Sequence, residues 1–300
     1  MDDDGWTLDP DPLIGVIDVE PATASSTHAD GVSDPTALVH TALDDAGRFE
    51  GSDDAIDLVT GGPDTVLAAD PTLVVALGDS ALTAVARADA TAMSPVLPVD
   101  TSPGVSPIPA DALGRAFDAL AAGEATTEAY PLLSVSSDAS SSDAGSSDAG
   151  SSDAGSSEET RTRALFDVSL VTAEAARISE YGVTSRGRQI AQFRADGVVA
   201  ATPAGSHGYA SAADGPSLSG AISGLAVVPI APFVTRTRHW VLPDDGLSLS
   251  VEREGDDVTL CVDDRRVGTL EFGARVDIAV DPAAELGMLE TPFSRDPFVG

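Results

Sequence analysis

The chain has 300 residues, of which 42% are hydrophobic, enough to build a sizeable buried core in one or two domains. It carries 49 acidic residues against 16 basic ones, and every basic residue is an arginine, so the formal net charge is −33. This balance argues against nucleic acid as a partner. Molar salt shortens the screening length to about 3 Å and so weakens the repulsion between the acidic residues. The composition therefore favours a protein adapted to a salt-rich cytoplasm.

The sequence has no pattern typical of disulfides, of a metal site or of a membrane span. Cys261 is the only cysteine, which rules out an intrachain disulfide and a CxxC metal site, and the four histidines are scattered. No apolar run approaches the roughly 18 residues that a membrane span needs, and the first residues carry no basic signal segment. We expect a soluble, cytoplasmic protein with no membrane partner and no metal site built from its own side chains.

An acidic N-terminal tail is expected at residues 1–12, followed by an α/β domain at residues 13–135. In this domain short β-rich runs alternate with alanine-rich helical ones, which predicts a Rossmann-like fold with a largely parallel sheet. The predicted strands cover residues 13–18, 55–60, 72–78 and 95–99, and the predicted helices cover residues 35–48, 80–93 and 109–123. Gly123 is expected to end the last helix.

Residues 136–160 differ from their surroundings, because the sequence Ser-Ser-Asp-Ala-Gly repeats three times within them. Such a segment cannot bury enough apolar surface to offset its ordering entropy. We expect a disordered insertion in a surface loop. A functional tether is the alternative.

Residues 161–285 show a β-like period, which predicts an antiparallel, β-sandwich-like domain. Its predicted strands cover residues 165–172, 190–201, 225–230, 247–252, 258–262 and 276–280. Residues 255–257 and 263–265 look like hairpin turns, and residues 286–300 are expected to form a C-terminal tail. The expected fold class is therefore α+β with two domains, an α/β Rossmann-like one followed by a β-sandwich-like one.

Within the second domain, residues 202–216 read TPAGSHGYASAADGP and follow the apolar run at residues 197–201. A strand therefore leads into a turn of small residues and then a short helix. Gly205 and Gly208 permit close backbone approach, and a helix N-terminus favours an anion. The segment is typical of a loop that binds a phosphate or a ribose.

In the first domain, residues 73–82 read LVVALGDSAL, an apolar strand that ends in a tight turn and starts a helix. This turn places Asp79 at the carboxyl end of a parallel sheet, the edge at which open α/β sheets bind ligands. A carboxylate there is suited to accept the proton of a hydroxyl that attacks phosphorus. The alternative is that Asp79 or Ser80 caps the helix.

Three segments carry a resemblance to the NAD kinase family. The order ADG at 195–197, TPAGS at 202–206, Tyr209 and GP at 215–216 resembles the family pattern ADG followed by TPTGSTAYSLSAGGP. GDS at 78–80 resembles GGDGT, although Ser80 replaces its last glycine, and ALFD at 164–167 resembles ALNE or ALND with Phe166 in place of the asparagine. The chain looks like a divergent NAD kinase of haloarchaeal type.

The resemblance implies transfer of a phosphoryl group from ATP or polyphosphate to the adenosine-ribose 2′-hydroxyl of NAD, with Mg²⁺ carried by the donor. NAD is then a substrate, Asp79 is the implied base and a homo-oligomer is implied. The implied substrate-binding residues are Gly78, Ser80, Phe166, Asp167, Asp196, Thr202, Gly205, Ser206, His207, Gly208, Tyr209 and Ala212. The altered GDS element leaves open a non-catalytic paralogue that binds NAD(P) as a sensor or as the partner of an active kinase.

Several of these residues also have plainer interpretations. Phe166 either stacks on the dinucleotide or is a core residue, and His207 either bonds a ribose or phosphate or is a surface histidine. Asp196 is either a ligand or a turn carboxylate, and Tyr209 is either a ligand or a half-buried tyrosine.

Overall fold

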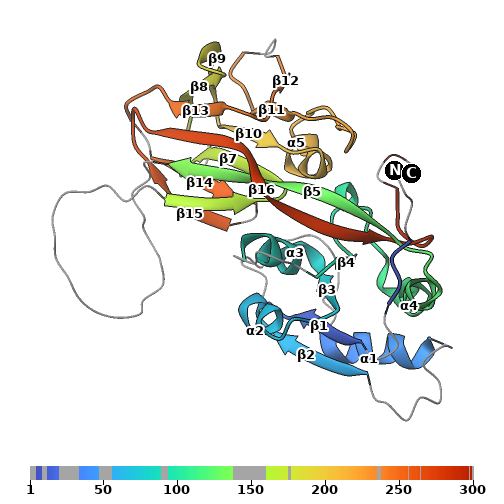
Figure 1. Ribbon diagram of the computed structural model, residues 1–300. Coiled ribbons are helices and arrows are strands. Elements are labelled where there is room, and N and C mark those ends of the chain that lie inside the picture. The colour runs from blue at the N-terminus through green and yellow to red at the C-terminus, as the bar shows by residue number, and fades with distance from the viewer. Residues whose placement is uncertain are drawn as a thin grey trace, which may run out of the picture. The chain divides into compact units, whose positions relative to one another are not determined.

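The computed structural model describes residues 5–8, 12–19, 34–46, 56–88, 94–137, 160–174, 177–234, 238–255, 257–263, 265–296 and 298 (Figure 1). The chain divides into two compact units. The first unit contains residues 1–131 and 282–300, and the second contains residues 132–281. Apart from residues 136, 137 and 160, the predicted insertion lies outside the described residues, as does most of the predicted N-terminal tail.

A parallel sheet forms the centre of the first unit. Its strand order is β2 (Asp57–Gly61), β1 (Leu13–Ile17), β3 (Leu73–Leu77) and β4 (Val96–Val99). The strands β1, β3 and β4 read as apolar runs rather than alternating ones, because a parallel sheet is covered on both faces. The predicted Rossmann-like architecture is confirmed.

Helices cover both faces of this sheet (Figure 1). The helices α1 (Pro35–Asp45) and α4 (Leu113–Ala122) share a buried cluster with Ile14 and Val16, so they lie on one face. Gly15 points to the other face, where a β-carbon would stand 2.4 Å from a methyl group of Val66 in α2 (Pro63–Ala68). α2 contacts α3 (Gly78–Arg87). As predicted, α4 ends at Gly123, which has φ +72°.

The second unit is built from two antiparallel sheets. One has the order β12 (Trp240–Leu242), β11 (Leu225–Ile230), β10 (Gly197–Ala201), β7 (Asp167–Thr172), β14 (Val258–Val262) and β15 (Arg265–Leu270). In the other, β16 (Arg275–Glu290) pairs with β13 (Leu247–Val251), which pairs with β8 (Ser179–Ser185), which pairs with β9 (Arg188–Ala195). β5 (Thr126–Ser137) and β6 (Thr160–Ala164) form a further antiparallel pair.

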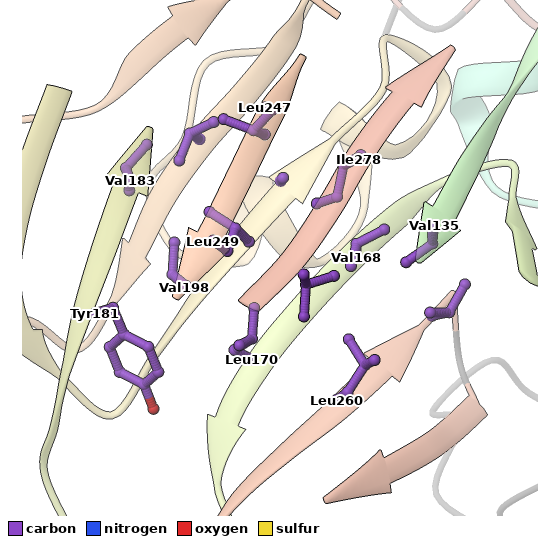
Figure 2. Packing of buried hydrophobic residues seen from close by; sticks show 14 of the residues in the cluster. Val135, Val168, Leu170, Tyr181, Val183, Val198, Leu247, Leu249, Leu260 and Ile278 are labelled. Carbon is purple, nitrogen blue, oxygen red and sulfur yellow. The ribbon is translucent and has the colours of Figure 1, made fainter. Parts of the chain in front are cut away.

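The inner faces of these two sheets form one core (Figure 2). Val168, Leu170 and Val198 from the six-stranded sheet are buried together with Leu247 and Leu249 of β13. Each such side chain contributes about 1.5–3 kcal/mol by leaving water. The predicted β-sandwich is thus confirmed. On the opposite face of β10 and β11, a second buried cluster contains Val199, Ala201, Ala226 and Val228 together with Ala210 and Leu218.

Three local expectations differ from the structure. The hairpin predicted at residues 255–257, of which residue 256 lies outside the described residues, is wrong, because the strands on either side, β13 and β14, belong to different sheets. β5 was not predicted, since Pro131 interrupts its pattern. Residues 286–290 are not part of a tail, because β16 continues to Glu290 and pairs with β4 through Met288 and Val96. Within the described part of the chain, no helix is long and apolar enough to cross a membrane.

Candidate functional site

The loop that follows β10 is fastened to the turn between β6 and β7. The amide of Thr202 donates to the Phe166 carbonyl at 2.8 Å, and the Thr202 hydroxyl donates to the Leu165 carbonyl at 2.7 Å. The same hydroxyl accepts the Gly205 amide at 3.1 Å. Thr202 is buried, so its side chain builds the loop rather than offering a surface to a ligand.

Ser206 is also buried and also works within the loop, which begins with the 3₁₀ helix η3 (Ala204–His207). Its hydroxyl donates to the Pro203 carbonyl at 2.7 Å and accepts the Leu218 amide at 2.8 Å. The amides of Gly205, Ser206 and Gly208 all donate inside the loop. These three amides are therefore not directed at a phosphate, which differs from what the glycine pattern indicated.

The rim of the loop is what reaches solvent. His207 is half-buried, Gly208 and Ala212 are exposed, and Tyr209 is 42% exposed. Tyr209 and Ala212 begin and end the short helix α5 (Tyr209–Ala212). Asp214, just beyond it, has φ +60°, a conformation that suits the glycine found there in the family pattern. Of the predicted residues in this loop, His207, Gly208, Tyr209 and Ala212 are thus the accessible ones.

Tyr209 shares its surroundings with acidic and thiol groups. Burial raises the pKa of Tyr209, and the charges of Asp167, Cys261 and Asp196 raise it further. Burial and the charge of Asp167 also raise the pKa of the Cys261 thiol, while Arg266 lowers it. Residues of β7 and β14 alternate between the two faces of their sheet, and Val168 and Leu260 point into the core. Asp167 and Cys261 are therefore on the outer face.

Phe166 and Asp167 lie at the turn itself and are nearly covered, with exposed fractions of 7% and 8%. The burial of Phe166 agrees with the interpretation of this ring as a core residue. Asp196 lies at the other end of β10 from Thr202. Its carbonyl accepts the Thr172 amide at 2.9 Å and the Tyr181 hydroxyl at 3.2 Å, so its backbone fixes the start of β10.

One carboxylate in this region was not singled out by the sequence. Asp263, immediately after β14, accepts the amides of Phe166 at 2.8 Å, Leu165 at 3.2 Å and Asp167 at 3.3 Å. Its own amide donates to the Asp167 carbonyl at 2.8 Å. Nearly a hundred residues separate Asp263 from this turn along the chain, so no local motif indicates the contact.

The other predicted group lies in the first unit, where β3 ends and α3 begins. Asp79 accepts the Ser102 amide at 2.7 Å and the Ser102 hydroxyl at 2.5 Å. The N-cap position of α3 is Leu77, so neither Asp79 nor Ser80 occupies it. Gly78 has φ +76°, which directs the chain into the helix. Ser102 was not predicted, although it orients both oxygens of the candidate base.

Gly78, Asp79 and Ser80 thus belong to the first unit, and the other predicted site residues belong to the second. In the described ranges, no three histidine, cysteine, aspartate or glutamate side chains are grouped to hold a metal ion.

Residues 165–285 match the family model of the ATP-NAD kinase C-terminal domain. This part of the chain is similar to the C-terminal domain of NAD kinases. Every candidate residue of the second unit, from Phe166 to Ala212 together with Asp263, lies inside the range that matches this NAD kinase domain.

Curated NAD kinases are similar to this chain over part of their length. An NAD kinase from Methanosarcina mazei is 33% identical over 101 residues, which cover 33% of this chain and 35% of that relative. An NAD kinase from Polaromonas naphthalenivorans is 36% identical over 118 residues, covering 39% of this chain and 40% of the relative. The matched segment thus spans about a third of the first of these proteins.

Solved structures of NAD kinases extend the likeness of fold to both units. A yeast NADH kinase complexed with NADH superposes with a TM-score of 0.66 at 18% identity, over 95% of this chain and 85% of that one. An NAD kinase from Archaeoglobus fulgidus in complex with ATP gives 0.63 at 16% identity, over 93% of this chain and 94% of that one. The fold of both units therefore resembles that of these two structures.

Proposed function

We propose that this protein is an NAD kinase, which transfers a phosphoryl group from ATP or polyphosphate to the adenosine-ribose 2′-hydroxyl of NAD and so forms NADP. The observation that carries the proposal is the match of residues 165–285 to the ATP-NAD kinase C-terminal domain. The loop at residues 202–216 and the turn at residues 165–167 are tightly assembled inside that domain.

In this proposal the second unit holds the dinucleotide. His207, Tyr209 and Ala212 supply the accessible rim, and the buried Thr202 and Ser206 keep that rim in place. The carboxylates of Asp167 and Asp196 are suited to accept hydrogen bonds from ribose hydroxyls. The Tyr209 hydroxyl can donate a hydrogen bond, since a phenol is protonated at neutral pH and burial raises the pKa of this one further.

The first unit supplies the base. Asp79 takes the proton from the ribose 2′-hydroxyl as its oxygen forms a bond to the terminal phosphorus, and the bond to the leaving phosphate breaks. Gly78 and Ser80 flank this carboxylate at the start of α3. Ser102 holds the Asp79 carboxylate in one orientation through two hydrogen bonds, which suits a group that must meet one particular hydroxyl.

Mg²⁺ is proposed to enter with the phosphate donor, because phosphate oxygens are its usual ligands and no cluster of protein ligands is grouped within the described ranges. When bound, the ion would neutralise charge on the donor phosphates.

We further propose that the protein works as a homo-oligomer in a salt-rich cytoplasm. The composition of 49 acidic and 16 basic residues supports the salt-rich cytoplasm, because salt screens the repulsion between charges of one sign. Thermal unfolding measured between about 0.1 and 3 M KCl tests whether the protein is adapted to high salt. A melting temperature that does not rise with salt would contradict it.

NADP⁺ formation by the purified protein tests the central proposal. The assay contains molar KCl, Mg²⁺ and NAD⁺, with ATP or polyphosphate in separate reactions. Asp79→Asn should abolish turnover, whereas Asp64→Asn, which removes an acid from the first turn of α2, should not. Saturable NAD⁺ binding without any turnover would instead identify a non-catalytic dinucleotide-binding protein, and absence of both would reject the proposal.

A further inference from the structure

The turn between β6 and β7 is held from both sides of its backbone. On one side, the Thr202 hydroxyl donates to the carbonyls of Leu165 at 2.7 Å and Phe166 at 3.1 Å. On the other, one carboxylate oxygen of Asp263 accepts the amides of Leu165, Phe166 and Asp167. The polar backbone groups of the turn are therefore saturated by two side chains that are distant in sequence.

The three amides that converge on Asp263 form a concave site of the kind that binds anions. Hydrogen bonds to an ionised carboxylate are about twice as strong as neutral ones. Asp263 itself has φ +54°, and its amide donates to the Asp167 carbonyl at 2.8 Å, which continues the pairing of β14 with β7. Asp263 thus fixes the turn by its side chain and the first residue of β7 by its backbone.

The turn positions two things: the Asp167 side chain, and the Leu165 and Phe166 carbonyls that accept hydrogen bonds from Thr202 of the 202–216 loop. The loop amide of Thr202 donates to the Phe166 carbonyl, and the backbone of Gly205 lies directly against that residue. Movement of the turn would displace both Asp167 and the loop that bears Tyr209. No step of the proposed reaction requires Asp263 to touch substrate.

We infer that Asp263 is a positioning residue for dinucleotide binding, acting through the Leu165, Phe166 and Asp167 backbone. The inference rests on the proposed function, because it concerns the NAD-binding half of that site. Loss of the carboxylate should weaken NAD⁺ and leave the phosphate donor almost unaffected, since the candidate base and its neighbours belong to the other unit.

Asp263→Gly is the most informative variant, because glycine adopts the positive φ at this position without strain. It removes the carboxylate without distorting the backbone. Asp263→Asn keeps an oxygen acceptor and also tolerates this conformation, so it serves as the conservative rescue. Asp34→Ala is the matched control: it removes a carboxylate that caps α1 through the Ala37 amide at 3.0 Å in the other unit.

NAD⁺ binding by calorimetry and the separate KM values for NAD⁺ and donor are then compared. We expect Asp263→Gly to raise the dissociation constant and KM for NAD⁺ on the order of 10- to 100-fold, with the donor KM nearly unchanged. Asp263→Asn should recover most of this loss, and Asp34→Ala should bind NAD⁺ like the parent. Unchanged NAD⁺ affinity in folded Asp263→Gly would overturn the inference, as would equal weakening of NAD⁺ and donor.

Amide hydrogen exchange needs no ligand and separates this inference from the proposed function. Exchange at residues 165–167 should be faster in Asp263→Gly than in the parent protein, and unchanged exchange would overturn the positioning role. If the parent protein binds no NAD⁺, the proposed function fails whatever the exchange experiment shows.

Discussion

Gly205 and Phe166 approach each other so closely that a β-carbon on Gly205 would lie 2.0 Å from the Phe166 carbonyl oxygen. No real β-carbon contact is that short, and the obstacle is backbone rather than a flexible side chain. The absence of a side chain at Gly205 is therefore a condition for closing the loop onto the turn.

Gly205→Ala should consequently force the two segments apart. We expect a stability loss of about 1–3 kcal/mol and at least tenfold weaker NAD⁺ binding, measured by denaturant unfolding and calorimetry. Gly62→Ala is the control, because Gly62 has φ −66° in extended backbone and an added β-carbon would meet no atom within 4 Å. Similar losses in the two variants would contradict this account.

Ser102→Ala tests how Asp79 is oriented. The Ser102 hydroxyl donates to Asp79 at 2.5 Å, and its removal leaves only the amide to hold the carboxylate. We expect kcat to fall on the order of tenfold with little change in the KM for NAD⁺, and stability to fall by about 1 kcal/mol. Ser94→Ala removes a hydroxyl that bonds the Pro71 carbonyl in the same unit and should leave kcat unchanged.

The Cys261 thiol reports on the charge of the outer sheet face that it shares with Asp167. Burial and the Asp167 carboxylate raise the pKa of Cys261, so its alkylation by iodoacetamide should begin at higher pH than for an ordinary cysteine. Asp167→Asn removes the negative charge, lowers this pKa and should shift the pH profile of alkylation downward. Asp245→Asn, which alters an exposed pair with Arg186, should leave the profile in place.

A carboxylate pair in the first unit predicts a stabilising substitution. Burial, followed by the charge of Glu290, raises the pKa of Glu128, which also accepts the Tyr130 hydroxyl at 3.1 Å. Glu128→Gln keeps that acceptor and removes the repulsion, so we expect a gain of about 0.5 kcal/mol at neutral pH and low salt.

The pH dependence of this gain follows from the direction of the shift. Folding raises the pKa of Glu128 above its unfolded value of 4.5. Ionised Glu128 therefore lowers the stability at pH above the folded-state pKa, and this cost is absent at pH below 4.5. The advantage of Glu128→Gln should therefore vanish as pH falls through that range, and molar KCl should shrink it. Thermal unfolding across pH 3–8 measures this, and a gain that persists at pH 3 would refute the explanation.

The sequence predicted those elements whose pattern is dominated by burial. The apolar runs of β1, β3 and β11 are buried on both faces of their sheets, so hydrophobicity alone located them. It did not reveal which strands pair. Residues 255–257 resemble a hairpin turn, but the inner faces of β13 and β14 pack into one core from opposite sheets, and that choice depends on long-range packing.

For the candidate site, the sequence predicted which segments form it but not which hydrogen bonds their side chains make. Thr202 and Ser206 were expected to face substrate, yet their hydroxyls bond backbone groups up to 37 residues away. Asp263 and Ser102 were not predicted either, because each bonds a residue that is distant in the sequence and no local motif includes both partners. Residue type indicates which bonds are possible, and only the fold decides which are made.

The first unit closes with a strand drawn from the far end of the chain, because β16 reaches β4 through Met288. During synthesis on the ribosome, residues 1–131 emerge early, but the β16 segment of their sheet emerges only after the entire second unit. The second unit is continuous and can fold first as an insert. Its β-sandwich is then complete before the half that bears Asp79 acquires the β16 segment of its sheet.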